Sequence, residues 1–495
     1  MSERLLLGID EGTTAVKAAL FDCELRVVAQ ARRPVALSHP RQGWVEQDPE
    51  EILEAVVQAV AEVLEQTGGR EVMAAGIDHQ GESVMAWDAR GARALTRVIV
   101  WQDKRQQALL EGLDASVVER SGLPLDPYFS AGKMAWLARN DEGVMQACER
   151  GTLRMGTVES FLLERLARRF ATDLSTASRT QLLALGGRDW DERLLQCFGV
   201  RREWLARIGP TFGRLGELRH ESWPVSIPLR AQLVDQQAAL AGSGAVKVGE
   251  VKATYGTGVF VLGRTDVPHA PPGLLPTVAW AGPVRDGGGE SGHTRDADVG
   301  EPAYALDGGV FTAGSLLDWL AQGLGLARDT PSLLTIAAGV RDASGVTVLP
   351  ALAGLGAPWW RADAHGVLAG LHGGVTPAHV ARAALESIAM RVADIVEAMG
   401  EVDCVHADGG LSNDATLLEI QADALGVPLR VGAADATVAG AALLAGVGAG
   451  AFSDVQDAVA HLPGARTVNP TLDERERVRR RRRWREFVQR SAELG

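Results

Sequence analysis

The sequence predicts an α/β protein made of two related halves that face each other across a cleft. Residues 5–22 and residues 251–262 each place two apolar runs around a short turn of glycine and threonine, which is the pattern of a β-hairpin. After each hairpin, short apolar runs alternate with longer stretches of helical periodicity. A glycine-rich stretch at 242–249 separates the halves, and we place the domain boundary there.

Length and composition are those of an ordinary globular protein of two or three domains. The chain has 495 residues, of which 46% are hydrophobic and 23% charged. Its net charge of −13 argues against binding to nucleic acid or to anionic lipid, although local amides or a metal ion could still hold an anionic substrate. The four cysteines are far apart and form no C-x-x-C pair, which suits a reducing compartment and suggests neither disulfides nor a zinc site.

No segment is expected to enter a membrane. The apolar run near the N-terminus is too short for a signal peptide and stops at Asp10. The least polar stretch, residues 437–452, is rich in glycine and alanine and short for a membrane span, so we expect a helix buried in a core. These observations predict a cytoplasmic protein.

The first hairpin is a candidate phosphate site. Gly12 in its turn can take a positive φ, so that backbone N–H groups point into one concavity, and Thr13, Thr14 and Lys17 add donors and positive charge. Asp10, at the end of the first strand, could hold a Mg²⁺ ion, usually through water. Taken alone, the same residues also suit an ordinary turn, because Asp-x-Gly is common turn chemistry.

The rest of the first half predicts strands that end in polar groups. Residues 27–37, 73–77, 84–87 and 98–100 resemble strands, and a helix is expected from Pro49 to about residue 66. The strand at 73–77 ends in a polar cluster, residues 78–83, and open α/β sheets bind ligands at such ends. Gly81 would equally suit a plain turn, and His79 fits a hydrogen-bonded structural residue better than a catalyst.

Two aromatic residues are candidates for a ligand pocket. Trp101, after the strand at 98–100, could line a sugar pocket with one face of its ring or belong to the core. Tyr128, before a helix at 134–138, could equally be a pocket wall or simple packing. Further helices are expected at 156–168, 190–198 and 203–208, with a polar loop at 172–179.

Asp235 follows a strand at 229–234 and opens an apolar helix. An acid in this position is often a helix N-cap. A carboxylate at the C-terminal end of a strand, beside a substrate hydroxyl, is also a candidate general base. The residues alone leave both interpretations open.

The second half opens as the first does, with Gly256, Thr257 and Gly258 in the turn between two strands. Two such turns could hold the phosphates of a nucleotide from both sides. Residues 286–302 are polar, acidic and rich in glycine, which predicts a mobile surface insertion.

The remaining segments predict helices at 310–320 and 377–400 and strands at 346–350 and 402–407. A glycine turn at 409–410 would let a flat ring such as adenine lie against the backbone, or would simply precede a helix. Residues 473–492 predict a charged helix, whose arginine run at 479–483 is expected to be a solvated face.

Two long stretches carry specific motifs. The first is YFSxxKMxWLxRN at 128–140, and the second is GxLxGL at 366–371 followed by HVxxAALE at 379–386. Shorter motifs are GWVEQDP at 43–49, IVWQDKR at 99–105, VDQQAA at 234–239 and TYGTG at 254–258. With these motifs the chain resembles the FGGY carbohydrate kinases, and among them the glycerol kinases most closely, from residue 5 to about residue 450. The resemblance implies two actin-like (ribonuclease-H-like) ATPase domains facing across a central cleft.

The resemblance also implies roles. The protein would be an ATP-dependent kinase that requires Mg²⁺ and phosphorylates a terminal hydroxyl of a small polyol, with glycerol first. Asp235 resembles the catalytic base, and Asp10 together with Asp235 resembles the metal-associated acids. The implied polyol pocket comprises Gly81, Glu82, Trp101, Tyr128, Asp235, Gln236 and Phe260. The implied nucleotide site comprises Gly12, Thr13, Thr14, Lys17, Gly256, Thr257, Gly258, Gly314, Asp318, Gly410 and Asp414.

The implied organisation is an N-terminal domain over 1–244 that holds the polyol and the base, and a nucleotide-binding domain over 245–452. A helical tail over 453–495 would pack on the body. The resemblance also implies a homo-oligomer of two or four chains.

Three departures from the glycerol kinase pattern stand out. Gly81 occupies the position of an arginine, and the loss of its charged fork would leave space for a water or for a larger acceptor, such as a four- or five-carbon polyol or ketose. Asp318 and Asp414 stand where glycerol kinases carry Gln and Asn. Before Trp223 the chain lacks the lysine-bearing glycine loop that binds a sugar bisphosphate inhibitor in bacterial glycerol kinases, so that regulation is not expected.

A non-catalytic sensor that binds a nucleotide with the same fold is the rival from another functional class. The loss of the acid at position 10 or at position 235 would favour it. Both acids are present.

Overall fold

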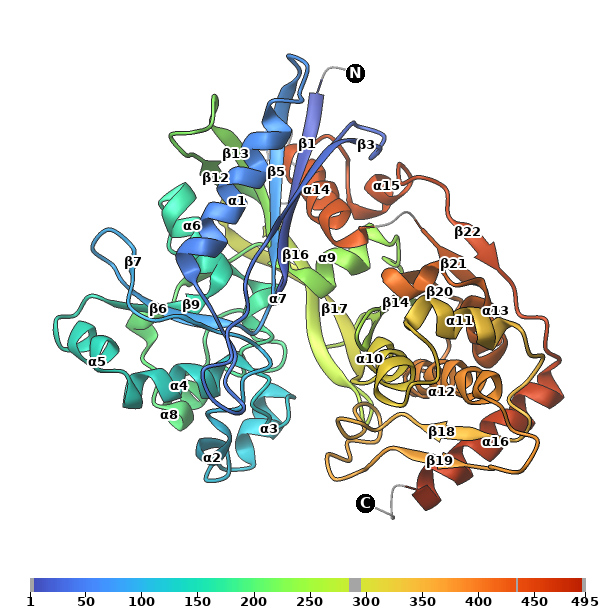
Figure 1. Ribbon diagram of the computed structural model, residues 1–495. Helices are drawn as coiled ribbons and strands as arrows, with labels where there is room; N and C mark the ends of the chain where they lie inside the picture. Colours follow the sequence, from blue (N-terminus) through green and yellow to red (C-terminus); the bar gives the residue numbers. More distant parts are fainter. Residues whose placement is uncertain (1–3, 285–294, 433–434, 492–495) are drawn as a thin grey trace.

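The computed structural model describes residues 4–284, 295–432 and 435–491. Each half of the chain is built around a large β-sheet, and the two halves lie side by side (Figure 1). Among the described residues, no helix combines the length and the apolar character needed to cross a bilayer.

The sheet of the first half begins with the predicted hairpin. Strands β1 and β2 are antiparallel, whereas β5 and β13 run parallel to β1 and continue the sheet on its other side. In spatial order the strands are β12 (Phe212–Leu218), β13 (Ile227–Val234), β5 (Glu71–His79), β1 (Arg4–Glu11), β2 (Ala15–Phe21) and β3 (Val27–Pro34).

The sheet of the second half repeats this arrangement. Its antiparallel hairpin, β14 and β15, is extended on one side by the antiparallel β17 and on the other by the parallel strands β20 and β21. In spatial order the strands are β16 (Leu275–Val284), β17 (Arg295–Val310), β15 (Val259–Thr265), β14 (Glu250–Tyr255), β20 (Cys404–Asp408), β21 (Leu429–Val431) and β22 (Arg466–Val468). The predicted relation between the halves is therefore confirmed at the level of topology.

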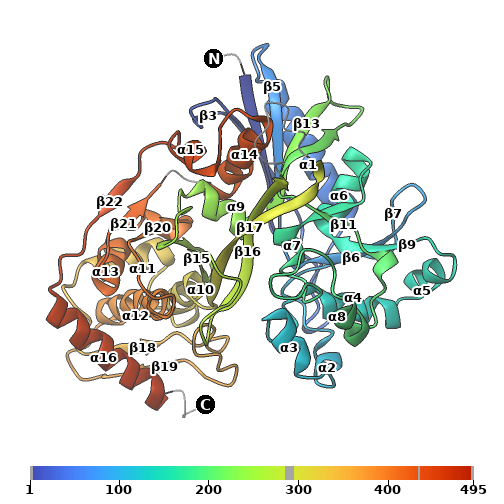
Figure 2. The same ribbon diagram turned by 180° about the vertical axis from the view of Figure 1, so that it is seen from behind.

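Two helices lie between the sheets, α9 (Asp235–Gly242) and α14 (Ala436–Ala449) (Figures 1 and 2). Their backbones touch, because a β-carbon at Gly440 would stand 1.8 Å from the carbonyl oxygen of Ala238. Helix α14 also lies directly on the first sheet, where a β-carbon at Gly76 would stand 2.0 Å from the carbonyl oxygen of Ala441. The glycine- and alanine-rich stretch is thus the buried helix that the sequence predicts.

Other helices cover the outer faces of the sheets. Helices α1 (Pro49–Leu64) and α6 (Val158–Ala167) pack on the first sheet, and α12 (Pro377–Ala398) and α13 (Ala415–Leu425) pack on the second. Asp48 caps α1 by accepting a hydrogen bond from the backbone N–H of Glu50 at 3.0 Å. With this cap and Pro49 at its first turn, α1 begins where the sequence predicts.

Smaller elements complete the two halves. In the first half, five short strands form a second sheet: β4 (Glu46–Gln47), β6 (Val84–Asp88), β7 (Arg93–Ala94), β8 (Val98–Ile99) and β9 (Leu153–Thr157). Beside it are α2 (Gln107–Leu110), α3 (Ser116–Ser121), α4 (Ser130–Asn140), α5 (Glu142–Glu149), β10 (Ala171–Asp173), α7 (Leu174–Ala177), α8 (Glu192–Phe198), η1 (Arg202–Trp204) and β11 (Arg207–Gly209). The second half adds α10 (Gly314–Asp318), η2 (Trp319–Gly323), α11 (Thr330–Ala338), β18 (Thr347–Leu349), β19 (Val367–Ala369), η3 (Gly410–Asn413), α15 (Val455–Val459) and α16 (Glu474–Ser491).

Three segments differ from the sequence prediction because long-range strand pairing decides them. Residues 295–302 belong to β17 and pair with β16, whereas the rest of the expected insertion, up to residue 294, lies outside the described residues. Val310 ends β17 opposite Val259 instead of beginning a helix, which starts at Gly314. The short helix expected at 203–208 is only the turn η1, followed by the strand β11.

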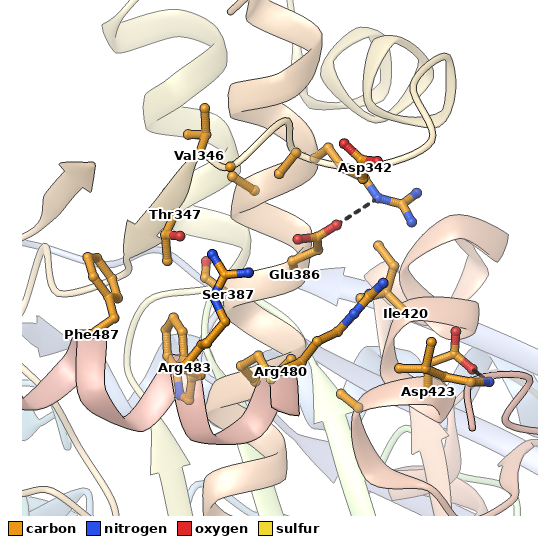
Figure 3. Close-up of a pocket in the computed structure, with 18 of the residues that line it drawn as sticks. Asp342, Val346, Thr347, Glu386, Ser387, Ile420, Asp423, Arg480, Arg483 and Phe487 are labelled. Atoms are coloured by element: carbon orange, nitrogen blue, oxygen red, sulfur yellow. Dashed lines mark hydrogen bonds and ion pairs between the residues drawn. The ribbon is translucent and has the colours of Figure 1, made fainter. Parts of the chain in front are cut away.

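The C-terminal helix α16 is bound to α12 by buried charges. Arg481 donates to Asp394 and to Glu397, each at 2.8 Å, and Trp484 donates its Nε1–H to Asp394 at 2.9 Å. The expectation of a solvated arginine run is therefore wrong for Arg481, although its neighbours at 479, 480, 482 and 483 are exposed. A cavity of about 550 Å³ lies between α16, α12, α13 and the loop before β18, and Figure 3 shows Glu386 and Arg480 on its walls.

Candidate active site

Three acids meet at the carboxyl edge of the first sheet. Asp10 is the last residue but one of β1 and is paired in register with Asp78, the last residue but one of β5, while Asp235 comes directly after β13. Asp78 is fully buried, and apart from a proton that it can share with Asp10, its carboxylate has no hydrogen-bond donor among the described residues. Burial and the charges of Asp10 and Asp235 raise its pKa well above the usual range.

Asp78 was not singled out from the sequence, which only placed it in a polar cluster at a strand end. Its neighbour His79 is hydrogen-bonded through Nε2 to the hydroxyl of Thr176 at 3.0 Å, as expected for a structural residue. Burial lowers the pKa of His79 to about 3, so this imidazole is neutral at physiological pH.

Asp235 is the first residue of α9 and not its N-cap, a position that Val234 occupies. Its carboxylate accepts a hydrogen bond from the backbone N–H of Gln236 at 2.6 Å. Burial, together with the charges of Glu82 and Asp10, raises the pKa of Asp235 to about 7. A carboxylate with this pKa can accept a proton near neutral pH.

The turn between β1 and β2 is closed by a hydrogen bond from the Gly12 N–H to the carbonyl of Ala15 at 3.2 Å. Gly12 does not adopt a positive φ, so its expected left-handed conformation is wrong, and the turn forms without it. Lys17 lies beside the acids, with its Nζ 3.8 Å from Asp10 and 2.6 Å from Asp435. It thereby supplies positive charge where the sequence places it.

The aromatic candidates gather into one cluster. The rings of Trp101 and Tyr128 pack edge to face with their centroids 5.6 Å apart, and the centroids of Trp101 and of Phe260 on β15 are 6.4 Å apart. The indole N–H of Trp101 donates to the hydroxyl of Thr13 at 3.0 Å. Thr13, a candidate phosphate donor, is therefore engaged with a candidate wall of the polyol pocket, and the cluster contains residues of both halves.

A buried arginine joins Glu82 to the second half. Arg179 donates its Nε–H to Glu82 at 2.8 Å, and its Nη2 lies 2.9 Å from Asp307 on β17. Its Nη1 is buried and has no hydrogen-bond partner among the described residues. The charges of Asp307 and Glu82 raise the pKa of Arg179 despite its burial, so the guanidinium remains charged. Sequence reasoning missed both Arg179 and Asp307, although Arg179 ends the polar loop at 172–179.

Gly81 has a close neighbour in Val234. A β-carbon at residue 81 would stand 2.7 Å from Cγ1 of Val234, which is itself buried. In that direction the space expected from the missing arginine is filled by an isopropyl group. An uncharged, apolar surface therefore adjoins Glu82 and Asp235.

The second hairpin turn is held against α10. Gly256 donates to the carbonyl of Gly258 at 2.9 Å, and Gly314 donates to the carbonyl of Gly256 at 3.1 Å. A β-carbon at Gly314 would stand 2.6 Å from that Gly256 oxygen, which explains the glycine. Thr257 at the tip of the turn is exposed. Nearby, Lys252 reaches across to the first half and donates to the side-chain oxygen of Gln236 at 2.7 Å.

The remaining nucleotide candidates lie on the second half. Gly410 is exposed, Asp414 caps α13 by accepting from the Leu417 N–H at 2.7 Å, and Asp318 accepts a hydrogen bond from the Thr330 hydroxyl. Within the described ranges, no hydrogen bond or ion pair joins these residues to the three acids. Asp414 thus has a structural role as the N-cap of α13.

Two family models match the chain. The model for the N-terminal domain of the FGGY family of carbohydrate kinases matches residues 5–242, and the model for the C-terminal domain of the same family matches residues 251–449. The segment between them, 243–250, overlaps the glycine-rich stretch that connects α9 to β14.

Curated relatives match over nearly the full length. The chain is 41% identical to a glycerol kinase of Thermus brockianus, covering 99% of this chain and 98% of the relative. It is 39% identical to a glycerol kinase of Citrifermentans bemidjiense, covering 98% of both chains.

Solved structures agree in fold. A glycerol kinase of Plasmodium falciparum with ADP superimposes with a TM-score of 0.89 at 28% identity, covering 99% of this chain and 98% of that one. A xylulose kinase from Rhodospirillum rubrum superimposes with a TM-score of 0.84 at 23% identity, covering 98% of both chains, which is a likeness of fold alone.

Proposed function

Because this chain belongs to the FGGY family of carbohydrate kinases, and is thus an ATP-dependent kinase of sugars or polyols, we propose that its acceptor is glycerol. The product would be glycerol 3-phosphate. The observation that most directly supports transfer to a hydroxyl group is Asp235, whose pKa of about 7 suits a base that takes the proton of the attacking hydroxyl. The names of the full-length relatives support glycerol as the acceptor.

The acceptor would lie between Asp235, Glu82 and the aromatic cluster of Trp101, Tyr128 and Phe260. Apolar ring faces can hold the carbon chain of a polyol, while buried polar groups fix its hydroxyls. The unpartnered Nη1 of Arg179 offers one such donor. Closure of the two halves would exclude water, which otherwise competes with the acceptor.

The residues at the sheet edge fit a divalent cation. Asp10, Asp78 and Asp235 are acids crowded into a buried place, and the carboxylate of Asp78 lacks a compensating donor in the described ranges. We propose that Asp10 and Asp235, with Asp78, hold Mg²⁺, which prefers oxygen ligands and neutralises charge on the transferred phosphoryl group. Lys17 adds a fixed positive charge beside them.

The nucleotide would be bound by both turns and by the second half. We propose that Gly12, Thr13 and Thr14 face the phosphates from one side and that Gly256, Thr257 and Gly258 face them from the other. Gly314, Asp318, Gly410 and Asp414 would lie on the adenosine side. In this division, residues 1–244 carry the acceptor and the base, 245–452 carry the nucleotide, and 453–495 form a tail on the body.

A larger acceptor is the second candidate. Gly81 offers no guanidinium to bind two neighbouring hydroxyls, and Val234 presents an apolar surface beside it. This environment is compatible with a four- or five-carbon polyol or ketose that makes its polar contacts elsewhere.

We further propose that the protein works in the cytoplasm as a homo-oligomer. Analytical ultracentrifugation of the purified chain would test the oligomeric state.

A coupled assay of ADP release over a panel of polyols and sugars tests the acceptor. The proposal expects the highest kcat/KM with glycerol. A kcat/KM for a C4–C5 acceptor that far exceeds the value for glycerol would replace glycerol as the substrate. If no acceptor stimulated ATP turnover, the non-catalytic sensor would be the better description.

The role of the base is tested with Asp235→Asn. We expect nucleotide affinity close to that of the unmodified protein and a turnover reduced by at least about 10²-fold, the usual contribution of a general base. Asp22→Asn, at the far end of the β1–β2 hairpin, is the matched control and should leave turnover unchanged. Unchanged turnover in Asp235→Asn would remove this residue from the mechanism.

A further inference from the structure

Three side chains with metal-binding chemistry meet where the chain passes from the first half to the second. Glu250 begins β14, and Cys404 and His406 lie on β20. A carboxylate oxygen of Glu250, the sulfur of Cys404 and a ring nitrogen of His406 all lie within 4.8 Å of one another. Each of the three residues is less than a tenth exposed.

Strand pairing brings these residues together. β14 and β20 are parallel neighbours, and Glu250 is paired in register with Cys404. His406 follows Cys404 by two residues, so both side chains leave the same face of the strand. The site therefore stands on rigid backbone, which favours a defined ligand geometry.

The imidazole of His406 is oriented as a ligand. Its Nδ1 lies 2.6 Å from the carbonyl oxygen of Ser243, which can only accept a hydrogen bond, so Nδ1 carries the proton. A neutral imidazole then has its lone pair on Nε2, and this atom lies 3.4 Å from the sulfur of Cys404. A metal-bound histidine usually donates a hydrogen bond from its other ring nitrogen to a carbonyl or carboxylate oxygen, as His406 does here.

The carboxylate of Glu250 is fixed in the same way. Its Oε2 accepts hydrogen bonds from the backbone N–H groups of Val246 at 3.1 Å and Lys247 at 3.0 Å. The other oxygen, Oε1, has the guanidinium of Arg430 only at 3.9 Å. One oxygen thus holds the side chain in place, and the other has capacity for a ligand bond.

The distances suit a tetrahedral ion. A zinc ion with bonds of about 2.3 Å to sulfur and about 2.0 Å to nitrogen holds these two atoms about 3.5 Å apart, close to the 3.4 Å between Cys404 and His406. We propose that Glu250, Cys404 and His406 bind one Zn²⁺-like transition-metal ion, with water as the fourth ligand. Binding replaces the thiol proton of Cys404, which leaves as one H⁺ per ion, and no oxidation occurs.

The ion would secure the crossing between the halves. Ser243 follows α9, and Val246 and Lys247 lie on the segment that leads to β14, so the ligands and their partners join this segment to β20. Because an ion that binds only the folded chain stabilises it, zinc should raise the melting temperature. The spacing of the cysteines could not indicate this site, because its ligands come from two strands that are distant in sequence.

Cobalt titration of the metal-free full-length protein tests the proposal. Co²⁺ bound to a thiolate gives a charge-transfer absorption in the near ultraviolet. A site made of carboxylates alone, such as Asp10, Asp78 and Asp235, does not give this absorption. We expect this band to saturate at one cobalt per chain and to disappear when zinc displaces the cobalt. We also expect zinc binding to release one proton, measured with a pH indicator in weak buffer.

Matched variants connect the band to these residues. Cys404→Ser should lack the band. His406→Gln should weaken cobalt binding by more than about 10–100-fold, the usual loss when a group that only hydrogen-bonds to a ligand is removed. Cys197→Ser is the control and should behave like the unmodified protein. Circular dichroism without metal checks that each variant is folded. The proposal is overturned if the unmodified protein shows no band at one equivalent of cobalt, or if the band persists in Cys404→Ser. In that case Cys404 and His406 form only an S–H···N hydrogen bond.

Discussion

The Cγ1 atom of Val234 lies 2.7 Å from the point where a β-carbon would stand on Gly81. Val234 is the last residue of β13 and precedes Asp235, and Gly81 follows the end of the neighbouring strand β5 by two residues. One side chain therefore connects the wall of the proposed acceptor pocket to the position of the candidate base.

The first prediction concerns this contact. Gly81→Ala should displace Val234 and cost about 1–3 kcal/mol of unfolding free energy, the usual penalty for overpacking, with a lower kcat/KM for the acceptor. Adding Val234→Ala should recover part of both losses. Gly112→Ala, at a position with open space around it, is the control and should stay within about 0.5 kcal/mol. Urea denaturation and acceptor kinetics measure these effects, and strictly additive losses in the double variant would exclude the coupling.

The second prediction concerns Arg179. Arg179→Met leaves Glu82 and Asp307 buried without their shared cation, and breaking a buried ion pair costs about 3–5 kcal/mol. We expect a lower melting temperature and a KM for the acceptor raised by at least about tenfold, while the KM for ATP changes little. Arg188→Met, whose side chain makes an exposed ion pair, is the control. An unchanged acceptor KM would place Arg179 outside the acceptor site.

The third prediction concerns pH. The pKa of Asp235 is raised to about 7, and a base acts only in its deprotonated form. The kcat/KM for the acceptor should therefore rise with pH through about 7 and fall about tenfold per unit on the acidic side. Asp235→Asn should lose this acidic limb as well as most of its turnover. A limb that remained in the variant would belong to another group.

The fourth prediction concerns the tail. Arg481→Ala removes one of two arginines from each acid, because Asp394 keeps a hydrogen bond from Arg391 at 3.1 Å and Glu397 keeps its ion pair with Arg485, so we expect a loss of about 1–3 kcal/mol of unfolding free energy. Arg482→Ala changes an exposed neighbour on the same helix and should stay within about 0.5 kcal/mol. Chemical denaturation of both variants compares them directly. Equal free energies of unfolding for the two variants would show that the ion pairs of Arg481 contribute little to the stability of the protein.

The hairpins, the helix beginning at Pro49 and the buried glycine- and alanine-rich helix could be predicted because local signals define them. Turn glycines, an Asp cap before proline and hydrophobic periodicity act over a few residues. Strand β17 could not be predicted, since its start lies in a polar, glycine-rich stretch and is decided by pairing with β16.

The candidate site shows the same limit. Asp10 and Asp235 could be named as candidates because each comes at the end of an apolar run. Arg179 and Asp78 could not be predicted. Each lies in a polar segment with no distinguishing pattern, and only the structure shows the acids that surround it. Thr13 is a candidate from the sequence, but its hydroxyl contact with Trp101 could not be predicted, because it joins two segments that are distant in sequence.

The position of α14 has a consequence for synthesis of the chain. This helix covers one face of the first sheet with backbone contacts at Gly76 and Gly8, yet it is formed by residues 436–449. A nascent chain that has completed all the strands of the first sheet still exposes that apolar face until the second half is nearly finished. The first half is therefore not an autonomous folding unit during translation, and a fragment ending at residue 242 should aggregate where the whole chain does not.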